Sequence, residues 1–458
     1  MPHPDPIRGL PTASHRAVAS RAHPARRWAV AYLTLATMPL LLSLTVGRMS
    51  NETWCTELSL ATGLAAASLL LAAYALPSRL RRLSVHLGIE TVLRSHRVVA
   101  VTATALVLLH VGLVIESNPK RWAVLDLTTA PPRVWAGTIA TVGLVVLVAL
   151  ALSRRRRRPR YEGWRLAHIV LAGVVIGGTI LHVWWLHHLI EKTVMALWFA
   201  ALGVTLLAVT VYRWLWRPVR SLRREYVVDE VRRESPAAVT VVLHARGHSG
   251  VPFLPGQFAW LKFGGSPFVF EEHPFTIASA ATKPWRKEFT IKALGDFTEL
   301  VAGLRPGRRV YLDGPHGRFT HASHPANGFV FVAGGVGITP MLSMLRTMAE
   351  EGDPRPALLF TGGRTVDELL HRDELRQLSK RTRLTVVEVL DTPPEDWTGE
   401  CGYLTAELIT RYLPRPRDRR RRQWFVCGPP PMIVAVLRAL DGLGVPREMV
   451  HTELFDMV

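Results

Sequence analysis

Six apolar stretches, each close to the ~20 residues that a helix needs to cross a bilayer, follow one another in the first half of the chain. They cover residues 28–46, 58–76, 98–115, 134–152, 166–186 and 193–214. The segments between them are too short to bury so much apolar sequence in a soluble fold. The sequence therefore predicts an all-α bundle of six transmembrane helices over residues 28–215, preceded by a flexible tail over residues 1–27.

The net charge of +20 gathers beside the apolar stretches. If the N-terminus lies inside, the inner segments hold far more Lys and Arg than the outer loops, and they include the arginine run 154–158. The positive-inside rule then predicts a multi-pass cell-membrane protein whose N-terminus and C-terminal half are cytoplasmic. Pro218 is expected to end the sixth helix. No helix-turn-helix or zinc-finger pattern accompanies the charge, so a nucleic-acid partner is not expected.

Four histidines stand at matched positions in two of these stretches. His96 and His110 are 14 residues apart, and His168 and His182 have the same spacing. That spacing is close to four helical turns, so the two histidines of one helix project from the same face, roughly 21 Å apart along the axis. Both helices run the same way, which sets His96 level with His168 and His110 level with His182. The pattern predicts two haems b, each held by one histidine from each helix. Hydrogen bonding to a neighbouring helix is the structural alternative.

From residue 225 the sequence takes on the alternation of β-strands. Short alternating runs such as EYVVDEVRR and AAVTVVLHA predict an antiparallel β-barrel over residues 222–322. Strands then alternate with helices, which predicts an α/β domain with a parallel sheet over residues 326–458. In GFVFVAGGVGITP we expect a strand, a glycine loop and a helix, with Thr339 as N-cap and Pro340 as first helical residue. Such a loop suits a pyrophosphate.

The order of motifs in this half resembles the flavin domain of the ferredoxin–NADP reductase superfamily. HPFT at 273–276, GDFT at 295–298 and DGPHG at 313–317 follow one another, and GGVGITP and CGP come later. They are most similar to the branch fused to haem-bearing membrane domains, the NADPH oxidases and ferric reductases. The resemblance implies a ferric reductase-like haem domain over 28–215, an FAD-binding barrel over 222–322 and an NAD(P)-binding domain over 326–458.

The resemblance also implies roles for single residues at the flavin. Phe275 would lie against the flavin ring, and the hydroxyl of Thr276 would hydrogen-bond it. Phe455, near the C-terminus, would cover the flavin until nicotinamide displaces it. The residues implied for FAD are His273, Pro274, Phe275, Thr276, Lys292, Gly295, Thr298 and Phe455. Among them, Lys292, Gly295 and Thr298 would meet the pyrophosphate, where a cation and backbone N–H groups suit the charge.

A second set of residues is implied for the nicotinamide nucleotide. It consists of Gly334, Gly335, Gly337, Thr339, Arg364, Cys427, Gly428 and Pro429. Arg364 can pair with a 2′-phosphate, which favours NADPH, or stack on the adenosine, which leaves NADH open. Cys427 would lie near the nicotinamide and is not interpreted as a nucleophile. The three cysteines form no CxxC, so a zinc site or a four-cysteine iron–sulfur cluster is not expected.

These features predict an enzyme that moves electrons across a membrane. Cytoplasmic NAD(P)H would reduce FAD, and the electrons would pass through two haems to an outer acceptor. Oxygen, giving superoxide, is the first expectation, and ferric iron, a quinone or an extracytoplasmic partner protein are the alternatives. A haem-free transporter or sensor regulated by its flavin domain is the alternative from another class.

Overall fold

The computed structural model describes residues 54–78, 89–117, 128–157, 161–186 and 193–455 except 414, together with a few isolated positions before 54 and between 126 and 191. It divides into two compact units, Met1–Val211 and Tyr212–Val458. Each unit is described by itself. The predicted tail and most of the first predicted span lie outside the described residues.

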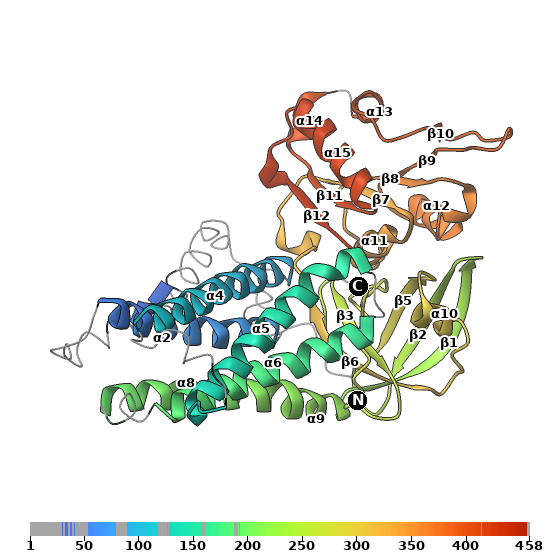
Figure 1. Cartoon of the computed structure of the whole chain (residues 1–458). Coiled ribbons are helices and arrows are strands. Elements are labelled where there is room, and N and C mark those ends of the chain that lie inside the picture. Colours follow the sequence, from blue (N-terminus) through green and yellow to red (C-terminus); the bar gives the residue numbers. More distant parts are fainter. Residues whose placement is uncertain are drawn as a thin grey trace. The chain divides into compact units, whose positions relative to one another are not determined.

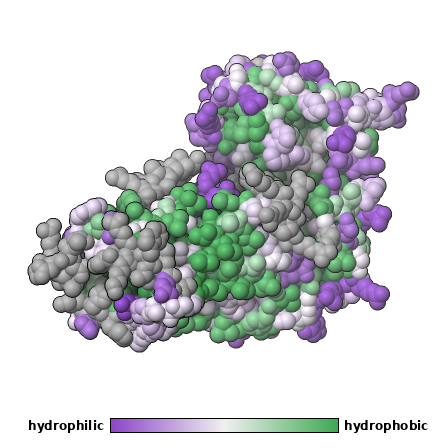
Figure 2. All heavy atoms as spheres, viewed as in Figure 1, coloured by the Kyte–Doolittle hydropathy of each residue, from purple (hydrophilic) through white to green (hydrophobic). Residues whose placement is uncertain are grey.

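The described part of the first unit is helical. Five helices are long and apolar enough to cross a membrane, and they match the second to sixth predicted stretches. Among the described residues, the helices of this unit are α2 (Trp54–Ala75), α4 (Ile89–Ser117), α5 (Pro132–Arg157), α6 (Tyr161–Trp184) and α8 (Thr193–Val211). Figure 2 shows that the visible face of these helices is largely hydrophobic. Exposed apolar side chains such as Val98, Leu108 and Val204 suit contact with lipid.

The helices of this unit associate mainly in two pairs. Helix α4 packs along α2, and α6 packs along α5. Small residues make the second pair close, because a Cβ atom added at Gly178 would lie 3.0 Å from the Ala136 oxygen. The Tyr74 hydroxyl and Thr210 Oγ1 are 2.9 Å apart, which joins α2 to α8. The histidine-bearing helices α4 and α6 are thus each supported by a separate partner helix.

Helical structure continues past the expected end of the sixth span. After α8 the chain forms a π-helical turn over Tyr212–Trp216 and then α9 (Arg217–Leu222), with Pro218 in the first turn of α9. The prediction that Pro218 ends the helix is therefore wrong. A π-helical turn lies directly before α9, and local π-helical adjustments accommodate the backbone hydrogen bond that a proline cannot make.

The second unit begins with a six-stranded sheet whose paired strands are antiparallel (Figure 1). Its strands are β1 (Glu225–Ser235), β2 (Ala238–Ala245), β3 (Phe258–Phe263), β4 (His273–Thr276), β5 (Arg286–Lys292) and β6 (Arg309–His316). Their order is β4-β3-β6-β1-β2-β5. One apolar core, with Tyr226, Leu261 and Phe289 fully buried, lies on the sheet. Closure of the sheet into a barrel stays a prediction.

A parallel sheet follows, as predicted, with strand order β10-β9-β8-β7-β11-β12. Its strands are β7 (Phe329–Gly334), β8 (Ala357–Gly363), β9 (Leu384–Leu390), β10 (Glu400–Cys401), β11 (Gln423–Cys427) and β12 (Val450–Glu453). Alternate residues of β7 enter two cores: Phe329 and Phe331 face one, and Val330 and Val332 face the other.

Helices cover both faces of this sheet (Figure 1). On one face α11 (Ile338–Glu351) and α12 (Arg372–Arg381) supply core residues. On the other face α13 (Ala406–Tyr412) and α15 (Pro430–Gly442) do so, with the short α14 (Pro416–Arg420) between them in sequence. The strand order reverses between β7 and β11, which is where doubly wound sheets bind ligands.

A polar interface fixes the antiparallel sheet against α11 and α12. Arg346 of α11 donates two hydrogen bonds to Glu374, one to Glu288 and one to the Ala278 carbonyl. His371, before α12, lies 2.9 Å from Thr290 Oγ1. Burial alone would raise the pKa of Glu374, but hydrogen bonds from His371 and Arg346 and the charge of Arg346 outweigh it and lower this pKa to about 2.

We predict that Arg346→Met destabilises the second unit by about 3 kcal/mol, because Glu288 and Glu374 lose the cation they share. The melting temperature, followed by tryptophan fluorescence of the solubilised protein, should fall by several degrees. Since the folded pKa of Glu374 is below its ordinary value of 4.5, its contribution is complete above that pH and is lost as the pH falls toward 2. Arg376→Met, in an exposed pair, is the control and should cost about 0.5 kcal/mol or less. Equal melting of Arg346→Met and wild type would contradict the prediction.

Candidate functional site

The structure brings the four membrane histidines together as two pairs. The ring centroids of His96 and His168 are 6.3 Å apart, and those of His110 and His182 are also 6.3 Å apart. Two metal–nitrogen bonds of about 2.0 Å each, plus the radii of two imidazole rings, sum to about 6 Å. Each pair therefore leaves the separation that one metal ion with two axial imidazoles requires. Helices α4 and α6 supply one histidine to each pair.

The outward ring nitrogens of three of these histidines meet backbone carbonyls of neighbouring helices. Nδ1 of His96 lies 2.8 Å from the Ala73 oxygen, and Nδ1 of His182 lies 2.7 Å from the Arg133 oxygen. Nδ1 of His110 lies 2.8 Å from the Ser59 oxygen. A carbonyl can only accept, so each Nδ1 carries the proton and Nε2 keeps its lone pair. This donor set fits haem iron, whose histidine ligands commonly donate their other ring N–H in this way.

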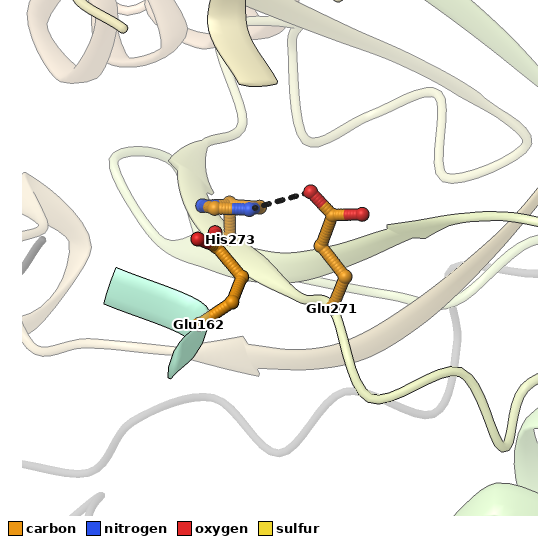
Figure 3. A group of neighbouring side chains, drawn as sticks. All are labelled: Glu162, Glu271 and His273. Atoms are coloured by element: carbon orange, nitrogen blue, oxygen red, sulfur yellow. Dashed lines mark ion pairs between the residues drawn. The ribbon is translucent and has the colours of Figure 1, made fainter. Parts of the chain in front are cut away.

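In the second unit, the HPFT residues form the edge strand β4 of the antiparallel sheet. Phe275 pairs with Ala259 of β3 and is half-buried. The ring of Phe297, from α10 (Asp296–Val301), stacks on the His273 ring at 3.7 Å and lies nearly parallel to the Phe275 ring at 6.3 Å. His273 Nε2 also lies 3.5 Å from a carboxylate oxygen of Glu271 (Figure 3). The loop thus presents a stack of flat rings, which suits an isoalloxazine.

Lys292, which was predicted to bind the FAD pyrophosphate, lies at the end of β5 and contacts a residue of the parallel-sheet domain. Its ammonium lies 3.4 Å from Glu368, which follows β8. Both side chains line a cavity of about 110 Å³ together with Gly335 and Val336 of the glycine loop. Thr298 Oγ1 accepts hydrogen bonds from the N–H groups of Leu294 and Gly295. Lys292 therefore faces the glycine loop, and its predicted role at FAD remains a proposal.

The glycine loop and the CGP loop follow adjacent parallel strands and lie against each other. A Cβ atom at Gly337 would lie 2.3 Å from the Cys427 oxygen, and one at Gly334 would lie 2.8 Å from Pro429. Gly335 has a φ of +54° and open space around its Cβ position. Two of these glycines thus serve loop packing, and Gly335 is the one that faces the cavity.

Helix α11 begins earlier than the sequence suggested. Its N-cap is Gly337, and Thr339 lies inside the first turn, where its hydroxyl donates to the Val336 oxygen. The prediction of Thr339 as N-cap and Pro340 as first residue is therefore wrong. A short 3-10 turn over Gly335–Gly337 leads directly into the helix and leaves no extended residue at 339 to act as a cap.

The other residues predicted to bind the nicotinamide nucleotide, and Phe455, follow the carboxyl ends of strands of the parallel sheet or end such a strand. Arg364 follows β8, and its backbone N–H donates to Glu368 at 2.9 Å. Cys427 ends β11 and is fully buried. Gly428 follows it, and Pro429 is the N-cap of α15. Phe455 follows β12, which pairs with β11 through Glu453 and Cys427. Phe455 is 38% exposed, and its cover over the flavin remains a proposal.

Sequence reasoning missed several residues that the structure adds. Phe297 lies within the GDFT motif, and an aromatic residue in a cofactor motif was the available signal. Glu368 could have been found as an acidic residue shortly after the second strand, where doubly wound folds meet the ribose. Gly63 lies against His110 and Gly137 against His182, and no signal in the sequence could have located these glycines without the helix pairing.

Three family models match successive parts of the chain. Residues 62–179 match the ferric reductase like transmembrane component, residues 237–318 an FAD-binding domain, and residues 331–438 an oxidoreductase NAD-binding domain.

Curated relatives and solved structures match about half of the chain. NADH-cytochrome b5 reductase 1 of Pyricularia oryzae is 33% identical over 40% of this chain and 61% of its own length. The reductase component of propane 2-monooxygenase from Mycolicibacterium goodii is 30% identical over 52% of this chain and 68% of its own. A ferredoxin reductase structure from carbazole 1,9a-dioxygenase matches with 26% identity, over 51% of this chain and 69% of that one, at a TM-score of 0.44. The chain thus spans less than two thirds of the cytochrome b5 reductase.

We predict that Phe275→Ala lowers the FAD content of the purified protein, because it removes a half-buried ring from the stack at the HPFT residues. Loss of one stacking ring is worth roughly 1 kcal/mol, or about fivefold in affinity. Phe268→Ala, an exposed phenylalanine in the same domain, is the matched control. FAD is measured by its absorbance after release from the protein. Equal FAD content in both variants would contradict the assignment.

Proposed function

We propose that this chain, which belongs to the NADPH oxidase and ferric reductase-like family of membrane flavoproteins, carries electrons from NAD(P)H through FAD and two b-type haems to an acceptor on the outer side of the membrane. The observation that carries this proposal is the matched separation of 6.3 Å in both histidine pairs. A bound flavin would supply the conversion of a two-electron hydride into single electrons, which a haem acceptor requires.

The chain's own residues bind and orient these groups. His96 and His168 would hold the inner haem, and His110 and His182 the outer one. The Nδ1 hydrogen bonds of His96, His110 and His182 would orient these three rings and keep the lone pair on Nε2. If both histidines of a pair ligate one haem, the protein would offer no open coordination position there.

The soluble half would bind the two dinucleotides. Phe275 and Phe297 offer the flavin a flat surface, and Thr276, buried at the end of β4, would meet the ring edge. Gly335 opens the cavity beside Lys292 for a phosphate. Phe455 would shield the flavin from water until nicotinamide arrives. The arginine-rich end of α5 supports a cytoplasmic position for this half.

The acceptor we propose first is oxygen, reduced to superoxide. Ferric iron is the second candidate, since residues 62–179 match a ferric reductase like component. The curated relatives named above are reductases by their printed names, and this supports electron donation to a further carrier as a third route.

The test begins with haem. Purified wild-type protein should carry two haems per chain, and His110→Ala and His182→Ala should each retain only the inner one. His248→Ala, in the second unit, is the control and should leave two. Absence of a haem band from the wild type would refute the proposal and favour a haem-free transporter or sensor.

The same preparation then decides the acceptor. NADPH-driven reduction of added cytochrome c is measured with and without superoxide dismutase. Inhibition by the dismutase supports oxygen as the acceptor. Reduction that the dismutase leaves unchanged contradicts it and places ferric iron or a carrier protein first.

We predict that Glu368 sets the choice between NADH and NADPH. A hydrogen bond from the Arg364 N–H is the main cause that lowers the pKa of Glu368, so the carboxylate is charged beside Arg364. Glu368→Gln should raise kcat/KM for NADPH relative to NADH on the order of fivefold, because it removes repulsion of a 2′-phosphate. Asp373→Asn, in the exposed part of α12, is the control. An unchanged ratio in Glu368→Gln would exclude this role.

A further inference from the structure

Three of the four membrane histidines are held by the same type of hydrogen bond. Each donates Nδ1–H to a backbone carbonyl of a neighbouring helix: His110 to Ser59, His182 to Arg133 and His96 to Ala73. In an α-helix every carbonyl also accepts from the N–H four residues later. A ring can therefore reach such a carbonyl only if the residue four positions on leaves room for it or has no N–H to offer.

At two of the three sites the residue four positions on is glycine. Gly63 follows Ser59, and Gly137 follows Arg133. A Cβ atom at either glycine would lie 2.9 Å from Nδ1 of the facing ring, closer than real Cβ contacts. Any side chain at these positions would push His110 or His182 away from its carbonyl.

At the third site the residue four positions on is proline. Pro77 follows Ala73 and has no N–H, so it cannot donate to the Ala73 carbonyl. Helix α2 ends at Ala75, and Leu76–Ser78 forms a 3-10 turn. A residue with an N–H at position 77 would donate to the Ala73 carbonyl. Because proline cannot, this carbonyl accepts from His96, whose Nδ1 lies 2.8 Å from the Ala73 oxygen.

We propose that Gly63, Gly137 and Pro77 are positioning residues for the haem ligands, and that helices α2 and α5, which carry no ligand, set the properties of both haems. The two glycines serve the outer pair, and the proline serves the inner pair. This inference rests on the proposed function. A ring that donates Nδ1–H is a more basic ligand, which favours ferric iron and lowers the potential.

The first test uses full-length protein with Gly63→Ala or Gly137→Ala, and Gly203→Ala in α8 as control, because a Cβ atom at Gly203 meets nothing within 4 Å. Haem per chain and both midpoint potentials are measured by spectroscopic redox titration. Loss of the hydrogen bond that holds a ligating ring costs about 10–100-fold in metal affinity. The outer haem should therefore be lost or move to a higher potential, while the inner haem stays as in wild type.

Pro77→Ala is the second variant, and it adds no bulk that could prevent folding. It supplies an N–H that competes with His96 for the Ala73 carbonyl, so the potential of the inner haem alone should rise. Potentials that stay at wild-type values in Pro77→Ala and in the glycine variants would overturn the inference. Equal shifts of both haems, or shifts in Gly203→Ala, would also overturn it. A wild-type protein without haem would refute the proposed function instead.

Discussion

An imidazole ring inside an apolar helix bundle has two nitrogens, and neither can turn to water. This constraint organises the first unit. The rings of each pair lie 6.3 Å apart, and Nδ1 of three of the four rings, His96, His110 and His182, has an acceptor on a neighbouring helix. Helices α2 and α5 supply that acceptor from their backbones, so α4 packs on α2 and α6 packs on α5. The helices that pack beside α4 and α6 are therefore also the ones that supply acceptors to the histidine rings.

In the second unit a single helix connects the two ligand-binding parts. Helix α11 starts at the glycine loop, and further along it contacts the antiparallel sheet. Ser343 donates to the Ser279 carbonyl, Thr347 accepts from the Ala281 N–H, and Arg346 binds Glu288. Because an α-helix is stiff over this length, the position of the nucleotide loop follows from these contacts. The distance between the two dinucleotide sites is thus set by packing within one body.

Much of this arrangement could be predicted from the sequence. The apolar stretches predicted five described helices, and the equal spacing of the histidines predicted their pairing level by level. Alternation and the glycine motif predicted the two sheets. The failures were local. Pro218 and Thr339 were each read as a helix boundary from propensity, but a π turn and a 3-10 turn moved both boundaries.

Other features could not be predicted because they depend on contacts between distant segments. Nothing near Gly63 in the sequence points to His110, and nothing near His371 points to Thr290. Such pairs arise only when helices or domains are placed side by side. A sequence pattern reports which residue types recur along one element, whereas the neighbours of that element are decided by the whole fold.

The contact between the glycine loop and the CGP loop has a thermodynamic consequence. Gly334, Gly337 and Gly428 let the two backbones touch, because a Cβ atom at any of them would lie 3.0 Å or less from an atom of the other loop. These contacts between the loops form when the chain folds, so part of the entropy of ordering the loops is lost during folding. A dinucleotide would then meet a smaller ordering cost on binding.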